Sequence, residues 1–290
     1  MRDRTKVRRF ALLAALASAA ITIGVGAGSA SAAPCQPIVT ADHPTGYTDP
    51  NGNVLLTAAY VNTTPPSDTD VDATGCDVGV FYDTGSHTLT DDNVFSSTYY
   101  GVLSVGSGAV TNITHSSVYD VGNHPHDGVQ RGIDVAYRDG SSGQLDHSQI
   151  FDYQKGGVLV AGGSNATVLS NVIRGLGPVT FIAQNGVQYS SGATGTVNNN
   201  YISDYQYTGC PKQNNGTCTY VVSTGILLFG VDPKQVDTKN NTYRNNDVNL
   251  LNASNSAMRT CGANGLAVAQ SVAAAGSLSC SPAYRGLPVH

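Results

Sequence analysis

A short phrase recurs along this chain, in which a glycine opens a run of apolar residues that alternate in a β-strand pattern. The clearest copy is Gly157-Val158-Leu159-Val160-Ala161. Six copies begin at Gly79, Gly101, Gly132, Gly157, Gly186 and Gly225. Their spacing of 22 to 39 residues predicts a solenoid, because each repeat is one coil that cannot bury its own apolar face.

A second pattern recurs between the glycine-led segments. It is a triplet that begins with Asn or Ser and ends with an apolar residue, as in Asn171-Val172-Ile173. Its first members are Asn93, Ser116, Ser148, Asn171, Asn200 and Asn241. If the coils stack in register, these side chains form an internal ladder with a step of about 4.8 Å. Asparagine suits such a ladder because its amide both donates and accepts hydrogen bonds.

A third pattern is the repeated order of an Asn-x-Ile segment, a variable loop and a Gly-Ile-x-x segment. Examples of the two segments are Asn171-Val172-Ile173 and Gly225-Ile226. Over about residues 76–250 the chain resembles right-handed parallel β-helix proteins of the pectate-lyase-like superfamily, of the secreted bacterial type. The resemblance implies an all-β, single-stranded solenoid of about six or seven coils. It also implies that the glycine-led strands form the floor of a substrate groove, with the variable loops as walls.

The termini differ from the repeats. Residues 1–32 are typical of a signal peptide, with five basic residues, an apolar core and the cleavage pattern Ala30-Ser31-Ala32. We expect an N-terminal cap at 33–75, the β-helix at 76–252, and a C-terminal cap or tail at 253–290 that includes a short helix at about 265–275. The expected location is extracellular, with no membrane association after cleavage.

Charge and cysteine content narrow the function. Without residues 1–32 the chain has 10 basic and 19 acidic residues, a net charge of −9, which disfavours a nucleic-acid partner. Every acidic residue is Asp. An even number of cysteines in an exported chain suggests disulfides, and pairing by locality gives Cys35–Cys76, Cys210–Cys218 and Cys261–Cys280. These bonds would staple both caps of a monomer.

Strand alternation places the third residue of each phrase on the outer face of the sheet. These residues are Phe81, Leu103, Asp134, Leu159, Gln188 and Leu227. The apolar majority could be a platform for sugar rings, could meet a partner, or could be covered by the long loops.

The candidate site lies at the polar break in this row. Its catalytic candidates are Lys155, Asp134, Arg131 and Arg138, and its substrate-binding candidates are Gln184, Gln188, Tyr153, His126 and Leu159. Neighbouring coils are about 5 Å apart, so these side chains could act together. No metal ligand is assigned, and calcium on Asp carboxylates stays open as a cofactor.

The resemblance implies chemistry on an acidic polysaccharide. Lyases of the superfamily remove the proton alpha to a uronate carboxylate and expel the sugar at the β position, which requires a base of lowered pKa. Lys155 qualifies if it is desolvated or lies beside an arginine. Glycoside hydrolases of this fold use paired carboxylates, and Asp152 and Asp204 are expected two coils, roughly 10 Å, apart; both could equally cap turns.

The segment His124-Pro125-His126-Asp127 is similar to the Asp-Pro-His signature of mannuronan C5-epimerases, although its first residue is histidine. We therefore expect a lyase-like or epimerase-like enzyme acting on an acidic polysaccharide. The alternative is a non-catalytic scaffold that binds a polysaccharide or a cell-surface glycan. His115 and His147 are expected to be surface residues in one column, but not on adjacent coils.

Overall fold

The computed structural model describes residues 32–209 and 222–254, together with two short strands at 267–268 and 279–280. Almost all of this is β-structure, arranged in three main sheets. Sheet I contains β1 (Gln36–Pro37), β4 (Thr57–Val61), β6 (Val78–Tyr82), β9 (Tyr100–Val105), β12 (Ile133–Arg138), β15 (Gly156–Val160), β18 (Asn185–Ser190), β21 (Thr224–Phe229) and β24 (Val248–Asn252).

The other two large sheets complete each coil. Sheet II contains β7 (Gly85–Thr90), β10 (Ala109–Thr114), β13 (Ser142–Asp146), β16 (Asn165–Leu169), β19 (Thr194–Asn198) and β22 (Val236–Asp237). Sheet III contains β5 (Asp70–Asp72), β8 (Asn93–Phe95), β11 (Ser117–Val121), β14 (Gln149–Tyr153), β17 (Val172–Val179), β20 (Tyr201–Tyr207) and β23 (Thr242–Arg244).

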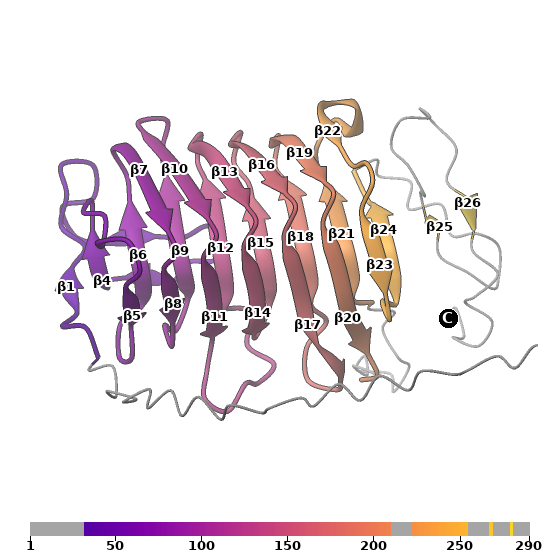
Figure 1. The fold of residues 1–290 in the computed structure, drawn as a ribbon, viewed down its shortest axis with the longest axis horizontal. Helices are drawn as coiled ribbons and strands as arrows, with labels where there is room; N and C mark the ends of the chain where they lie inside the picture. Colours follow the sequence, from indigo (N-terminus) through magenta and orange to yellow (C-terminus); the bar gives the residue numbers. More distant parts are fainter. Residues whose placement is uncertain (1–31, 210–221, 255–266, 269–278, 281–290) are drawn as a thin grey trace, which may run out of the picture. The chain divides into compact units, whose positions relative to one another are not determined.

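The chain visits sheets I, II and III in turn, so each coil places one strand beside its counterpart in the next coil (Figure 1). Within the described residues six consecutive coils, from β6 to β23, contain all three strands. Every pairing between them is parallel; β1 alone joins sheet I antiparallel, at β4. Parallel pairing already begins at β4 and β5, so the coiled region starts before residue 76, where the sequence pattern had placed it.

The sequence phrases correspond to the strands of sheet I, with one shift of register. Gly79 lies beside Gly101, but Gly101 lies beside Asp134 and not beside Gly132. A side chain at Gly101 would meet the Val118 side chain at 2.3 Å, which explains the need for glycine in this column. Gly132 has a different role, since it forms a turn with a φ of +84° just before β12.

The interior of the coils is apolar, with a polar ladder at one corner. Backbone N–H groups of Asp92, Ser116, Ser148, Asn171 and Asn200 each donate to the side-chain oxygen of the next ladder residue at 2.9–3.1 Å, ending at Asn241. The predicted ladder is therefore present, except that its first member is Asp92 and not Asn93.

The N-terminal segment covers part of the outer face of sheet I. The hairpin of β2 (Tyr47–Thr48) and β3 (Val54–Leu55) brings Tyr47 and Leu55 into one buried cluster with Phe81 and Leu103. The predicted Cys35–Cys76 disulfide is present and ties this segment to the start of β6. The apolar outer residues of β6 and β9 are therefore covered by the chain itself, as one of the three alternatives predicted. The covering element is the N-terminal segment and not the long loops.

The remaining sequence predictions fall at or beyond the limits of the described residues. Nearly all of the signal-peptide segment, Cys210, Cys218 and Cys261 lie outside them. The expected helix at about 265–275 is contradicted by β25 (Ala267–Val268), which pairs antiparallel with β26 (Ser279–Cys280). The described residues contain one short 3₁₀ helix, η1 (Pro233–Gln235), and no helix there has the length and apolar character needed to cross a membrane.

Candidate functional site

Three residues lie where the chain passes from sheet III into sheet I on consecutive coils, and we call them the corner row: Tyr99, Arg131 and Lys155. They precede β9, β12 and β15 on consecutive coils, and each is half-buried. Backbone hydrogen bonds place Tyr99 and Lys155 level with Gly132, since Ile133 N–H donates to Tyr99 O at 3.0 Å and Lys155 N–H donates to Gly132 O at 2.8 Å. Arg131 is therefore one position before this level on the middle coil.

Arg131 is held against Tyr99. Its Nη1 donates to Tyr99 Oη at 2.9 Å, and its guanidinium carbon lies 5.0 Å from the centre of the Tyr99 ring. Its Nε is buried without a hydrogen-bond partner. The aromatic ring thus orients the guanidinium by a cation–π contact while other donors of the group stay unused.

Lys155 is a cation in a poorly hydrated position. Its Nζ donates to the carbonyl of Ala183 at 2.7 Å. Burial lowers the pKa of this amine to about 8, because removal of water disfavours the charged form. The condition under which Lys155 could act as a base, desolvation of its amine, is therefore met.

A loop between β11 and β12 lies beside the corner row and carries His126. Its Nδ1 is 2.9 Å from Asn123 O, and its Nε2 lies 3.4 Å from Asp152 Oδ1. Gln154, which is fully buried, organises this loop: its Oε1 accepts from Asn123 and Asp127 N–H at 3.0 and 3.2 Å, and its Nε2 donates to Asp127 Oδ1 and Val129 O. His126 is mostly buried at the base of this loop.

Two substrate-binding candidates do face outward from sheet I. Gln188 on β18 is half-buried, and its Oε1 accepts from Asn185 Nδ2 at 3.0 Å. Leu159 on β15 is 8% exposed and belongs to the cluster beneath the N-terminal segment. The open part of the outer face therefore lies toward β18 and β21.

Four other candidates are buried, although alternation had predicted that two of them, Asp134 and Gln184, point outward. Asp134 and Tyr153 are fully buried, and Tyr153 Oη is hydrogen-bonded to Tyr205 Oη in the core. Arg138 is buried beside the N-terminal segment and donates to Tyr100 Oη at 2.8 Å. Gln184 is buried, and its Nε2 donates to the carbonyls of Tyr153 and Gln154 at 2.6 and 3.2 Å.

These corrections have simple causes. The extra register shift at β12 moves Asp134 into the inward glycine column, so the prediction of an outward side chain is wrong. Burial raises the pKa of Asp134 well above its ordinary value, and the nearby charge of Asp152 raises it further. The nearby backbone N–H of Phe151 opposes this shift in part, but its geometry is not that of a hydrogen bond, so neither carboxyl oxygen has a hydrogen-bond partner. Gln184 and Gln154 act as loop organisers, and this role has no signature in the sequence.

The paired residues Asp152 and Asp204 lie in turns. Asp152 and Asp204 occupy the same left-handed turn on coils two apart, with Gly175 between them, and have φ values of 57° and 68°. Asp204 accepts hydrogen bonds from Ser203 Oγ and Asn245 Nδ2 at 2.8 and 2.9 Å, as a turn cap does. Within the part of the chain that the structure describes, no group of three or more His, Cys, Asp or Glu residues is arranged to hold a metal ion.

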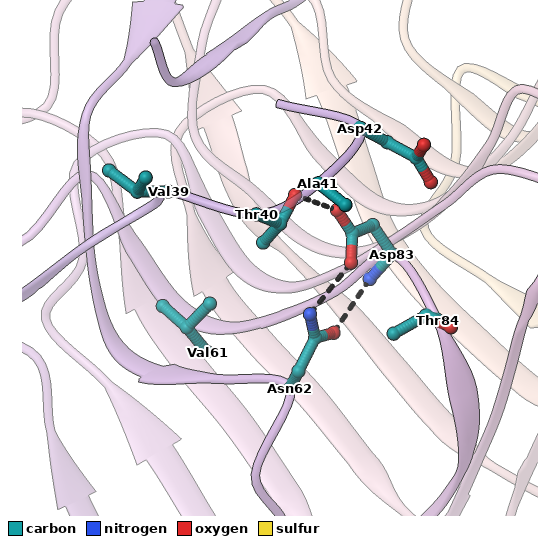
Figure 2. Close-up of a pocket in the computed structure, with 8 residues that line it drawn as sticks. All are labelled: Val39, Thr40, Ala41, Asp42, Val61, Asn62, Asp83 and Thr84. Atoms are coloured by element: carbon teal, nitrogen blue, oxygen red, sulfur yellow. Dashed lines mark hydrogen bonds between the residues drawn. The ribbon is translucent and has the colours of Figure 1, made fainter. Parts of the chain in front are cut away.

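A separate pocket lies between the N-terminal segment and the residues that end or follow β4 and β6 (Figure 2). Its volume is about 380 Å³, and its lining residues are Val39, Thr40, Ala41, Asp42, Val61, Asn62, Asp83 and Thr84. The Asp83 carboxylate accepts from Asn62 Nδ2 at 2.7 Å and from Thr40 Oγ1. Because these bonds occupy both oxygens, Asp83 joins the N-terminal segment to the first coil.

Tyr99 is the member of the corner row that sequence reasoning missed. It lies directly before a strand of sheet I, as Lys155 does, and it precedes Tyr100-Gly101. The alignment of residues that precede the strands would have found it. The glycines give the same answer, because Tyr99 lies two residues before Gly101 as Lys155 lies two residues before Gly157.

Comparison with known proteins agrees with this architecture. No curated protein and no solved structure shows a significant match to the chain. The family model described as a right handed beta helix region matches residues 66–226, which is more than half of the 290 residues. The three parallel sheets and this match together place the chain in the family of right-handed β-helix proteins.

Proposed function

We propose that this protein acts on an acidic polysaccharide at the corner row, as a lyase-like or epimerase-like enzyme in which Lys155 is the base. The observation that carries the proposal is the half-buried Lys155 amine, whose pKa is lowered to about 8 by burial. At pH 7 roughly a tenth of such an amine is neutral, which suits removal of a weakly acidic proton.

The neighbouring residues supply the other requirement of this chemistry. Arg131, one coil before Lys155, would bind the uronate carboxylate through the donors that Tyr99 does not use. This pairing acidifies the proton alpha to the carboxylate. After Lys155 Nζ takes that proton, the electron pair either expels the glycosidic oxygen at the β position or is reprotonated from the opposite face of the ring. The first outcome is elimination, and the second is epimerisation.

Export to an extracellular location is part of the proposal. The signal-peptide pattern of residues 1–32 supports it, and the Cys35–Cys76 disulfide is typical of oxidising compartments. A polysaccharide or a cell-surface glycan is then the accessible partner, and the acidic net charge disfavours nucleic acid. We expect the protein to be a monomer.

The test uses a panel of uronic-acid polymers with the purified mature chain, with and without calcium. Elimination is followed by the ultraviolet absorbance of the unsaturated product, and epimerisation by the uronate composition of the polymer. We expect Lys155→Ala to abolish turnover, Arg131→Gln to raise KM more than it lowers kcat, and the exposed-residue control Lys234→Ala to leave both unchanged. Activity that persists in Lys155→Ala would refute the assignment of the base.

A second candidate function is binding without catalysis. It is favoured by the burial of Asp134, Arg138 and Gln184, which removes three of the predicted groups from the outer face. In that case the corner row would pair uronate carboxylates with Arg131 and Lys155 and do no chemistry. Saturable polymer binding that requires both residues, without product and without a change in uronate composition, distinguishes this function.

A further inference from the structure

His115 and His147 form a pair at a different corner of the coils, where sheet II passes into sheet III. His115 follows β10 and His147 follows β13, so the two residues lie on adjacent coils, contrary to the sequence expectation. Their rings are stacked, with centroids 5.3 Å apart and planes inclined by 15°. Both residues are exposed.

The backbone presents the two imidazoles in the same way. Both residues have left-handed conformations, with φ values of 51° and 47°. In addition, His115 N–H donates to the carbonyl of Asp146 at 3.3 Å, which links the two turns. Asp91, Ser170, Asn199 and Asn240 occupy the equivalent turns of other coils. Small polar residues are therefore sufficient for the turn, and the consecutive histidines add a feature that the turn does not need.

Each ring has one nitrogen engaged and one available. Nδ1 of His115 lies 2.9 Å from Thr114 Oγ1, and Nδ1 of His147 lies 3.2 Å from Asp146 Oδ2. The described residues offer no hydrogen-bond partner to either Nε2. A carboxylate on Nδ1 fixes that proton and leaves the Nε2 lone pair free, which is the arrangement found behind histidines that bind metals.

We propose that His115 and His147 form a two-histidine site for a first-row transition-metal cation such as Cu²⁺ or Zn²⁺. Imidazole nitrogens bind these ions at about 2.0–2.1 Å, so a shared ion needs the two Nε2 atoms within about 4 Å of each other. Both side chains are exposed, and the proposal requires that the stacked rings tilt toward each other until the two Nε2 atoms reach that separation. Water would complete the coordination, with Asp91 of the preceding coil as the nearest carboxylate in the column.

The donor set predicts selectivity. Imidazole prefers Cu²⁺, Ni²⁺ and Zn²⁺, with Cu²⁺ bound most tightly, whereas Ca²⁺ and Mg²⁺ require oxygen ligands. This site does not depend on the proposed function. The corner row lies between sheets III and I, whereas the histidine pair lies between sheets II and III, and the two sites share no residue.

The experiment measures binding of Cu²⁺ and Zn²⁺ to tag-free mature protein by calorimetry, with nitrogen coordination followed by Cu²⁺ paramagnetic resonance. We expect His115→Gln and His147→Gln each to weaken binding at least tenfold. Asp146→Asn should weaken it by about tenfold, as loss of a partner on Nδ1 does elsewhere. Ca²⁺ in excess should not compete.

The exposed His124 is the matched control, because it and His126 form another close histidine pair, with ring centroids 5.6 Å apart. His124→Gln should leave affinity unchanged. Unfolding transitions of all variants show whether the fold is retained. Equal affinity of wild type and the His115→Gln/His147→Gln double variant would overturn the proposal, and so would loss of binding in His124→Gln alone.

Discussion

Asp134 lies beside Gly101 in the inward column of sheet I, so that one coil has a carboxyl group where its neighbours have no side chain. This carboxyl is fully buried, and neither of its oxygens has a hydrogen-bond partner. A buried polar group without a partner costs about 1–3 kcal/mol. Asp134 is therefore a point of local instability in an otherwise apolar interior.

Asp134→Ala is expected to stabilise the protein by about 1–2 kcal/mol at pH 7, because it removes the unpartnered group and retains the β-carbon. The measurement is the free energy of unfolding in denaturant. Asp42→Ala, at an exposed position, is the control and should have little effect. A less stable Asp134→Ala protein would mean that the carboxyl is satisfied in solution.

The pH dependence of stability gives an independent check on Asp134. Burial raises its pKa in the folded state, whereas in the unfolded chain the pKa is about 3.9. Above pH 4 the unfolded chain loses this proton first, so stability falls as the pH rises toward the folded-state pKa. The stability difference between Asp134→Ala and wild type should therefore grow from pH 4 to pH 7. A constant difference would contradict the raised pKa.

The fold was predictable because its signals repeat. The glycine column, the apolar residues after it and the Asn/Ser ladder recur on most coils because the same close contacts recur there. Side-chain directions at single positions were less predictable. Asp134 was misplaced because Gly132 serves a turn, and the resulting two-residue shift is visible only in the pairing of β12 with β9.

The candidate site was predicted in part. Lys155 and Arg131 were found because charged residues are rare in this chain and these two lie next to strands. Arg138 was assigned to the same site, but the N-terminal segment folds over the outer face and buries it, with Tyr47 donating to the adjacent Asp139 at 2.7 Å. That contact joins residues 92 positions apart, and no local pattern encodes it.

Because of the internal ladder, replacing a buried asparagine should destabilise the protein much more than replacing an exposed one. Asn171 Oδ1 accepts from Ser148 N–H at 2.9 Å, and its Nδ2 donates to Leu145 O at 2.9 Å. Asn171→Ala should cost about 2–4 kcal/mol, since it leaves two buried backbone groups without partners. Asn171→Ser should cost less, because serine fills this position at 116 and 148. Asn165→Ala, at an exposed position, should change the unfolding free energy by under about 0.5 kcal/mol.

The Cys35–Cys76 disulfide closes a loop with a sequence separation of 41 residues. Replacing both cysteines by serine should lower the free energy of unfolding by about 2–4 kcal/mol, mainly because the unfolded chain gains freedom. Reduction of the wild-type protein should cause at least this loss, because it also breaks the bonds predicted at Cys210–Cys218 and Cys261–Cys280. The loss on reduction should be smaller in the double variant than in wild type, and equal losses in the two proteins would show that Cys35–Cys76 contributes nothing.

The lowered pKa of Lys155 can be tested without any substrate. Reductive methylation of the native protein, followed by peptide mass spectrometry, gives the rate of modification of each lysine as a function of pH. For Lys155 the rate should follow a titration with a midpoint near pH 8, and the exposed Lys234 and Lys239 serve as references in the same sample. A Lys155 profile that coincides with both references would remove the physical basis for its role as a base.

The lowered pKa of Lys155 should also appear in the pH dependence of the free energy of unfolding. In the unfolded chain a lysine titrates near 10.4, so between pH 8 and pH 10 the unfolded state holds the proton that native Lys155 has released. Native stability should therefore contain a contribution that rises with pH over this interval. Lys155→Met should lose that rise, whereas Lys234→Met should keep it. The two variants, compared by denaturant unfolding at pH 8 and pH 10, separate desolvation of this one amine from the general effect of alkaline pH.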